Sequence, residues 1–247
     1  MKPATHSSKN EVLVMLEPAA VEPITHGQRE AWERLVDALR QAISHTVQLD
    51  APLDALEEIT AHAQVLSSML SRFSGAKPVP RFQMPFDPAS PQSYLPYSPV
   101  AGALNPLAPP VALTVEDDRL VGRVVLGAAY EGGVGFAHGG VVALIWDQVL
   151  ALANLAKGMA GPTGELRVRY LAPTPIGQEL RFEAWHERRE GRRIVALGRC
   201  YAGSVVVSEA EGVFVALDAS SKRRTGWGAH SQAVGTLPER LRAGGKP

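Results

Sequence analysis

The most apolar stretch of the sequence contains one carboxylate. Asp147 is the only charged residue between positions 141 and 156, and aliphatic residues make up most of that stretch. A carboxylate on an apolar helix costs several kcal/mol unless a partner or a function compensates for it. We therefore interpret Asp147 as a candidate functional residue. The structural alternative is a buried carboxylate paired with Arg167 or Arg169.

A second candidate precedes this stretch at His138, Gly139 and Gly140. If a helix begins here, its first backbone N–H groups are free, and the positive end of its dipole meets a segment without bulky side chains. Such a turn can bind an anion or the oxyanion of a reacting carbonyl. Alone, the same residues would indicate a tight turn with a hydrogen-bonded histidine.

The spacing of the two candidates predicts a shared site. Gly139 and Asp147 are eight residues apart, which is about 12 Å along one helix at roughly 1.5 Å per residue. One carbonyl group cannot contact both residues of the same helix. If two such helices lie antiparallel across a two-fold axis, each Asp147 approaches the other chain's Gly139. If both features serve one reaction, the spacing therefore predicts an obligate homodimer with two equivalent, shared sites.

An α+β fold is expected to position these residues. The pattern predicts a helix over 139–157, and its apolar residues on all sides indicate burial inside a sheet. A Gly-rich loop over 127–137 precedes it. Alternating polar and apolar residues and the intervening turn residues predict six strands, which form one antiparallel sheet wrapped around the helix. The expected strands are 111–116, 119–126, 164–171, 180–189, 192–201 and 205–217.

The rest of the chain divides by composition. Residues 1–24 are expected to be flexible, and 25–75 to form two helices, the second capped by Asp50. Ten of the 19 prolines lie between positions 78 and 110, so residues 76–110 are expected to be an extended covering segment with a turn at Gly102. The sheet domain is assigned to 111–218. Residues 219–247 are expected to be a flexible tail with at most a short helix at 238–242.

Composition excludes several classes of function. The 247 residues contain 25 Lys and Arg and 25 Asp and Glu, so the basic excess of a nucleic-acid binder is missing. The single cysteine, Cys200, excludes an internal disulfide, and the histidines show no metal-ligand spacing. We expect no cofactor and no metal. The apolar stretch falls short of the roughly 20 residues of a membrane span, and without a targeting signal the predicted location is the cytoplasm.

Taken together, these motifs resemble the hotdog-fold acyl-CoA thioesterases of the PaaI-like group, in which a His-Gly-Gly turn is followed by an aspartate. The resemblance covers about residues 110–217. It implies a hotdog fold and hydrolysis of a thioester to a free acid and coenzyme A by a homodimer or a dimer of dimers, with coenzyme A present only as part of the substrate. The matching residues are Tyr130, Glu131, Gly132, Phe136 to Gly140, Asp147 and Thr163 to Tyr170.

The resemblance also implies roles for individual residues. Gly139 would donate its N–H to the thioester oxygen, His138 would orient the loop, and Gly140 would help to bind the coenzyme A ester. Asp147 of the opposite chain would act as general base or as nucleophile, and Thr163 would position water or the carboxylate. Some relatives have a glutamine where this sequence has Gly132. Without that side chain to contact the carbonyl, the role of hydrogen-bond donor is expected to fall to Gly139.

Two alternatives use the same residues differently. The domain would be a sensor if it bound acyl-CoA without turnover, with the N-terminal helices and the basic tail serving a partner. An enoyl-CoA hydratase ranks last, because that branch resembles a different histidine-containing loop. Trp146, next to Asp147, is interpreted as a core residue.

Overall fold

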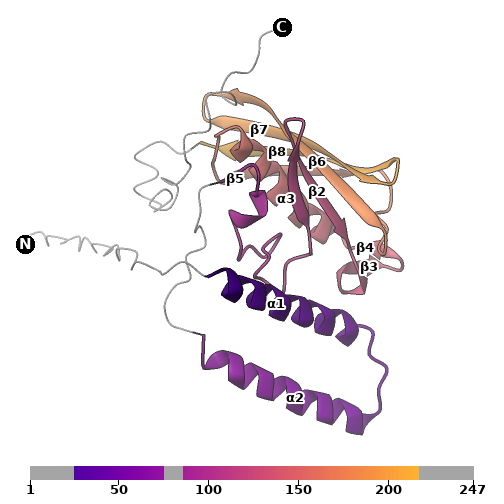
Figure 1. Ribbon diagram of the computed structural model, residues 1–247. Coiled ribbons are helices and arrows are strands. Elements are labelled where there is room, and N and C mark those ends of the chain that lie inside the picture. Colours follow the sequence, from indigo (N-terminus) through magenta and orange to yellow (C-terminus); the bar gives the residue numbers. More distant parts are fainter. Residues whose placement is uncertain (1–24, 75–85, 217–247) are drawn as a thin grey trace, which may run out of the picture.

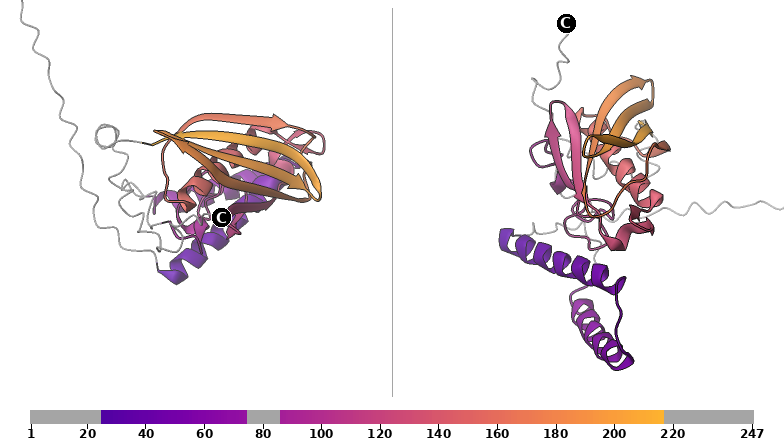
Figure 2. Two further views of the ribbon diagram at one scale, coloured as in Figure 1. Left: turned by 90° about the horizontal axis from the view of Figure 1, so that it is seen from above. Right: turned by 90° about the vertical axis from the view of Figure 1, so that its right-hand side faces the viewer.

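The computed structural model describes residues 25–74 and 86–216, and its centre is one six-stranded antiparallel sheet around one helix (Figure 1). The strand order is β1-β2-β6-β7-β8-β5. The sheet curves over helix α3 (Gly139–Ala156), as Figures 1 and 2 show. This arrangement confirms the predicted fold. The strands are β1 (Ala112–Glu116), β2 (Arg119–Val125), β5 (Thr163–Tyr170), β6 (Glu179–Glu190), β7 (Arg193–Ala202) and β8 (Val205–Val215).

Side-chain alternation explains how the strands form this sheet. On β6, Leu180, Phe182 and Ala184 are fully buried, whereas the residues between them are partly exposed. The β1–β2 hairpin turns at Asp117 and Asp118, which both have positive φ. Two successive positive φ angles match the twist of a tight hairpin, and Asp tolerates them better than most residues.

Helix α3 is buried on the side that faces the sheet and partly open on the other side. Trp146 is completely buried, with its ring 4.9 Å from that of Phe182. Its indole N–H donates to the Ser208 hydroxyl at 3.1 Å. On the open side, 40% of Leu144 is exposed. The apolar pattern therefore overstated the enclosure of the helix. Among the described residues, α3 alone is long and apolar enough to span a membrane, but more than half of it is buried inside the protein.

The described part of the Pro-rich segment, residues 86–110, packs against one edge of this core. Residues 86–110 contain only a short 3₁₀ turn, η1 (Pro91–Ser93). The Gln92 side chain donates to Val111 O at 2.9 Å and accepts from the Leu113 N–H at 3.1 Å, so it continues the hydrogen bonding of β1. A Cβ at Gly102 would lie 2.5 Å from Pro96 O and from Ser98 N and O. The segment therefore turns tightly at the predicted glycine.

Two helices precede the sheet domain. Helix α1 (His26–Thr46) begins with a capping box between Thr25 and Gln28, and it lies against the Pro-rich segment. Helix α2 (Leu53–Ser71) lies on the far side of α1 and has no buried residue (Figure 1). The predicted cap was wrong, because Pro52 occupies the N-cap position and makes no side-chain hydrogen bond there. Asp50 lies two residues before that position.

The remaining predictions fall on short or undescribed segments. The expected loop over 127–137 contains a 3₁₀ turn, η2 (Ala128–Tyr130), and a small hairpin of β3 (Glu131–Gly133) and β4 (Phe136–Ala137). The predicted flexible ends, 1–24 and 219–247, and the short helix at 238–242 lie outside the described residues.

Candidate active site

The start of α3 forms a turn that leaves one backbone donor free. His138 is the N-cap of the helix, with extended backbone angles, and its Nδ1 accepts the Gly140 N–H at 2.9 Å. Within the part of the chain that the structure describes, no hydrogen bond engages the Gly139 N–H. This group lies at the N-terminus of an 18-residue helix, where the dipole contributes roughly half a positive charge. The turn can therefore stabilise a developing negative charge.

Tyr170 holds the same turn from the opposite side. Its hydroxyl donates to Gly139 O at 2.6 Å. Burial raises the pKa of Tyr170 above its ordinary value, so the hydroxyl remains a proton donor at neutral pH. The peptide between Gly139 and Gly140 is thus fixed at both ends, by Tyr170 at its carbonyl and by His138 at its N–H. The sequence prediction gave Tyr170 no role.

An open hollow of about 410 Å³ borders this turn. Gly139, Phe136 and Tyr170 contribute to its wall together with residues 171–174. Phe136 is 43% exposed and Val134, in the same hairpin, is 95% exposed. The surface beside the turn is therefore apolar and accessible in a single chain.

The carboxylate lies farther along α3 and meets Thr163 at the start of β5. The Thr163 hydroxyl donates to Asp147 Oδ1 at 2.7 Å. The register of β5 against β8 shifts between Thr163 and Glu165, and such irregularities re-aim a side chain at the end of a strand. Just before this point, a Cβ at Gly161 would lie 2.3 Å from Val215 O, so only glycine allows this close approach of the chain.

The alternative partners proposed for Asp147 are excluded by their own contacts. Arg167 pairs with Glu165 at 3.3 Å and with Glu211 at 3.8 Å. Arg169 pairs with Glu209 at 3.5 Å. Both arginines alternate with inward-facing residues of β5 and point to the other face of the sheet. Asp147 is therefore half-buried and accepts a hydrogen bond from a threonine hydroxyl, and no cationic side chain among the described residues pairs with it.

The predicted site residues form two groups in one chain. His138, Gly139 and Gly140 are together at the start of α3, and Asp147 and Thr163 are together two turns later. Strand β5 holds both groups, because Thr163 at its beginning contacts Asp147 and Tyr170 at its end contacts Gly139. Along the helix the separation is about 12 Å. Because α3 is bound to β5 at both of these points, it cannot bend to bring Gly139 and Asp147 of one chain together.

A metal centre is not indicated in residues 25–74 and 86–216, where no three His, Cys, Asp or Glu side chains are grouped to bind a cation. Cys200 is fully buried, and burial raises the pKa of its thiol to about 12. A thiol with such a pKa is a poor nucleophile at neutral pH.

An antiparallel sheet around a core helix, with a glycine turn and a carboxylate on that helix, defines a hotdog-fold protein. Residues 134–208 match the family model described as the thioesterase superfamily. A crystal structure of a thioesterase superfamily protein is 31% identical over 74% of this chain and 90% of its own, with a TM-score of 0.68. The chain therefore belongs to the thioesterase superfamily.

Smaller solved structures match less of the chain. A putative thioesterase from Ralstonia eutropha JMP134, described as a phenylacetic acid degradation-related protein, is 24% identical over 43% of this chain and 84% of its own, with a TM-score of 0.39. A hypothetical thioesterase from Streptococcus pneumoniae TIGR4, solved with coenzyme A, is 18% identical over 43% and 87%, with a TM-score of 0.41. No curated protein matches the chain significantly.

The match over 74% of the chain has a further consequence. The sheet and its core helix, residues 112–215, make up less than half of the sequence. The similarity to that crystal structure therefore extends beyond the hotdog domain into the N-terminal part of the chain.

Proposed function

We propose that this protein is an acyl-CoA thioesterase that hydrolyses its substrate to a free acid and coenzyme A at a site shared by two chains. The observation that carries the proposal is a pair of groups on α3: a helix N-terminal donor, Gly139 N–H, and a carboxylate, Asp147, whose one hydrogen-bond partner within the described residues is a hydroxyl. Membership of the thioesterase superfamily supports the reaction class. The reaction needs no cofactor beyond the coenzyme A of the substrate, and we place it in the cytoplasm.

The geometry divides the work between the two groups of residues. The Gly139 N–H donates to the thioester oxygen and stabilises the charge that grows there. His138 and Tyr170 hold the adjoining Gly139–Gly140 peptide in place, and Gly140 leaves room for the ester. Asp147 takes a proton from water or attacks the carbonyl carbon itself. In both routes the C–S bond breaks, water supplies the new oxygen of the acid, and the coenzyme A sulfur leaves with a proton.

A homodimer completes each site. One helix cannot bring Gly139 and Asp147 to the same carbonyl, and two antiparallel copies of α3 can. The exposed apolar residues beside the turn, Val134, Phe136 and Leu144, are the type of surface that a subunit interface buries. We therefore place Asp147 of one chain opposite Gly139 of its partner.

The direct test measures thiol release from short, medium, long and aromatic acyl-CoA esters by wild type and by Asp147→Asn. We expect the variant to lose about 100-fold or more, as for the loss of a general base. Glu165→Gln is the matched control, because it removes an exposed carboxylate from the neighbouring strand and should retain activity. Binding of the esters without thiol release by wild type would replace the proposal with a sensor.

Mixing of variants tests the shared site. Chains with Asp147→Asn and chains with His138→Ala are each expected to be nearly inactive. A mixed dimer contains one site with both residues intact, so random reassembly should restore about a quarter of the wild-type activity. Recovery of none, with mixed dimers present, would show that each chain builds its site alone.

A further inference from the structure

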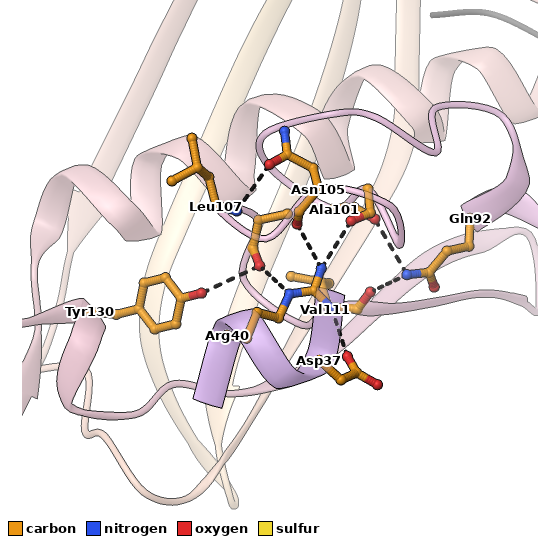
Figure 3. A network of polar contacts seen from close by, with 10 residues as sticks. Asp37, Arg40, Gln92, Ala101, Asn105, Leu107, Val111 and Tyr130 are labelled. Carbon is orange, nitrogen blue, oxygen red and sulfur yellow. Dashed lines mark hydrogen bonds and ion pairs between the residues drawn. The ribbon is translucent and has the colours of Figure 1, made fainter. Parts of the chain in front are cut away.

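Helix α1 is attached to the sheet domain by one arginine that binds three backbone carbonyls. Arg40 donates from Nη2 to Gly102 O and Asn105 O, both at 3.0 Å, and from Nε to Ala108 O at 3.1 Å (Figure 3). Its Nη1 also pairs with Asp37 one turn earlier, at 3.2 Å. Only 16% of the Arg40 side chain is exposed. The guanidinium is therefore a largely buried cross-link between α1 and the Pro-rich segment.

These carbonyls belong to a stretch without regular secondary structure. Residues 102–108 form successive turns, and their carbonyl groups need donors from outside the segment. A guanidinium presents several N–H groups in a fixed plane and forms strong charge-assisted hydrogen bonds. Arg40 thus fixes the course of the segment where it enters β1.

The same carbonyl of Ala108 also receives a hydrogen bond from the active-site side. The Tyr130 hydroxyl donates to Ala108 O at 3.3 Å (Figure 3), and burial raises the pKa of Tyr130, so its hydroxyl stays protonated. Helix α1 also packs directly against η2, the turn that contains Tyr130. Arg40 and Tyr130 therefore meet at one oxygen atom.

Tyr130 in turn holds the residue that caps α3. The His138 N–H donates to Tyr130 O at 2.8 Å, and the His138 side chain accepts the Gly140 N–H. A continuous series of hydrogen bonds thus connects Arg40 of α1 to the Gly139 turn through Ala108 O, Tyr130 and His138. The two contacts at Ala108 O are long-range, since Arg40 and Ala108 are 68 positions apart and Tyr130 and Ala108 are 22 apart.

We propose that Arg40 is a positioning residue of the active site: through the Ala108 carbonyl and Tyr130 it holds the turn whose Gly139 N–H faces the substrate. Helix α1 then helps to position the turn that binds the substrate. The kinetic part of this inference rests on the proposed function. Its structural part, the restraint of the 130–140 segment by α1, is independent of any activity.

The experiment compares Arg40→Met and Tyr130→Phe with Arg34→Met, a matched control that removes an exposed arginine from the same helix. Amide hydrogen exchange of the full-length protein is the first readout. We expect Arg40→Met to accelerate exchange in residues 130–140 by about tenfold or more, the effect of one lost hydrogen bond, and to leave β6 and β7 unchanged. Unchanged exchange in 130–140 in this variant would overturn the proposal.

Kinetics and a double variant give the second readout. Arg40→Met and Tyr130→Phe should each lower kcat for thiol release about tenfold with little change in KM, and the double variant should lose less than the product of the two, because both donors share one oxygen. A rise in KM alone would contradict the proposed link from Arg40 through Tyr130 to the Gly139 turn. So would a double variant whose loss of kcat equals the product of the two single losses.

Arg40→Lys keeps the charge and should fold even if Arg40→Met does not. A lysine cannot reach all three carbonyls with the geometry of a guanidinium, so we expect intermediate exchange in 130–140. Wild-type exchange rates with Arg40→Lys would contradict the proposal. If wild type releases no thiol from any ester, the proposed function fails, and the exchange experiment still decides whether α1 restrains the turn.

Discussion

Thr163→Val is the substitution that isolates the contact between the hydroxyl and the proposed catalytic carboxylate. Valine keeps the branched shape of threonine and removes the donor that lies 2.7 Å from Asp147 Oδ1. A hydrogen bond to a charged group contributes about 1.5–3 kcal/mol. If Asp147 needs that bond to be aimed at the substrate, kcat/KM should fall about 10- to 150-fold at roughly 1.4 kcal/mol per factor of ten.

The assay is thiol release from the best acyl-CoA ester, with denaturant unfolding measured in parallel. Because Thr163 is exposed, water can take the place of its hydroxyl, so the free energy of unfolding should fall by less than the about 1.5–3 kcal/mol of the hydrogen bond itself. Thr163→Ser is the control, because it retains the hydroxyl and should stay within a few-fold of wild type. If Thr163→Val hydrolyses the ester as fast as wild type, or if Thr163→Ser is as impaired as Thr163→Val, the positioning of the carboxylate by this hydroxyl is refuted.

Three further predictions concern the core. Gly198→Ala places a Cβ 2.3 Å from the Trp146 ring, so the free energy of unfolding in guanidinium should fall by about 1–3 kcal/mol, and an unchanged midpoint would contradict this packing. Burial, and then Lys157, lower the pKa of His186. As the pH falls, His186 of the unfolded chain therefore binds a proton before His186 of the folded protein does. The free energy of unfolding should decrease as the pH falls below about 6.5. His186→Gln should weaken that pH dependence when unfolding is measured at a series of pH values. Cys200, with its pKa raised to about 12, should react with a disulfide reagent only after unfolding, and rapid modification of the native protein would show that the thiol is accessible.

Regular side-chain patterns made the sheet and its helix predictable. Burial against α3 repeats every second residue along β6, and α3 is too apolar to lie in water, so periodicity alone predicted both elements. The β3–β4 hairpin was missed because its strands are three and two residues long, too short to show a period. The cap at Asp50 failed for a local reason, since the N-cap position of α2 lies two residues later, at Pro52.

The candidate site was predictable where chemistry was unusual for its surroundings. A carboxylate in an apolar stretch and two glycines at a helix start pointed to Asp147 and to the Gly139 turn. Tyr170 and Arg40 carry no such signal, because tyrosine at a strand end and arginine on a helix are ordinary residues. Their contacts span 31 and up to 68 positions, and only the folded chain brings these groups together.

The buried position of Trp146 has a consequence for its neighbour on the helix. Successive helical residues are about 100° apart around the axis, so the angle at which Asp147 leaves the helix is set once Trp146 is seated. The Ser208 hydroxyl accepts the indole N–H, and the absence of a side chain at Gly198 leaves room for the ring, so the indole fits in one orientation. The sheet thus prevents α3 from turning about its axis. The carboxylate at the protein surface acquires its direction from a contact made entirely inside the core.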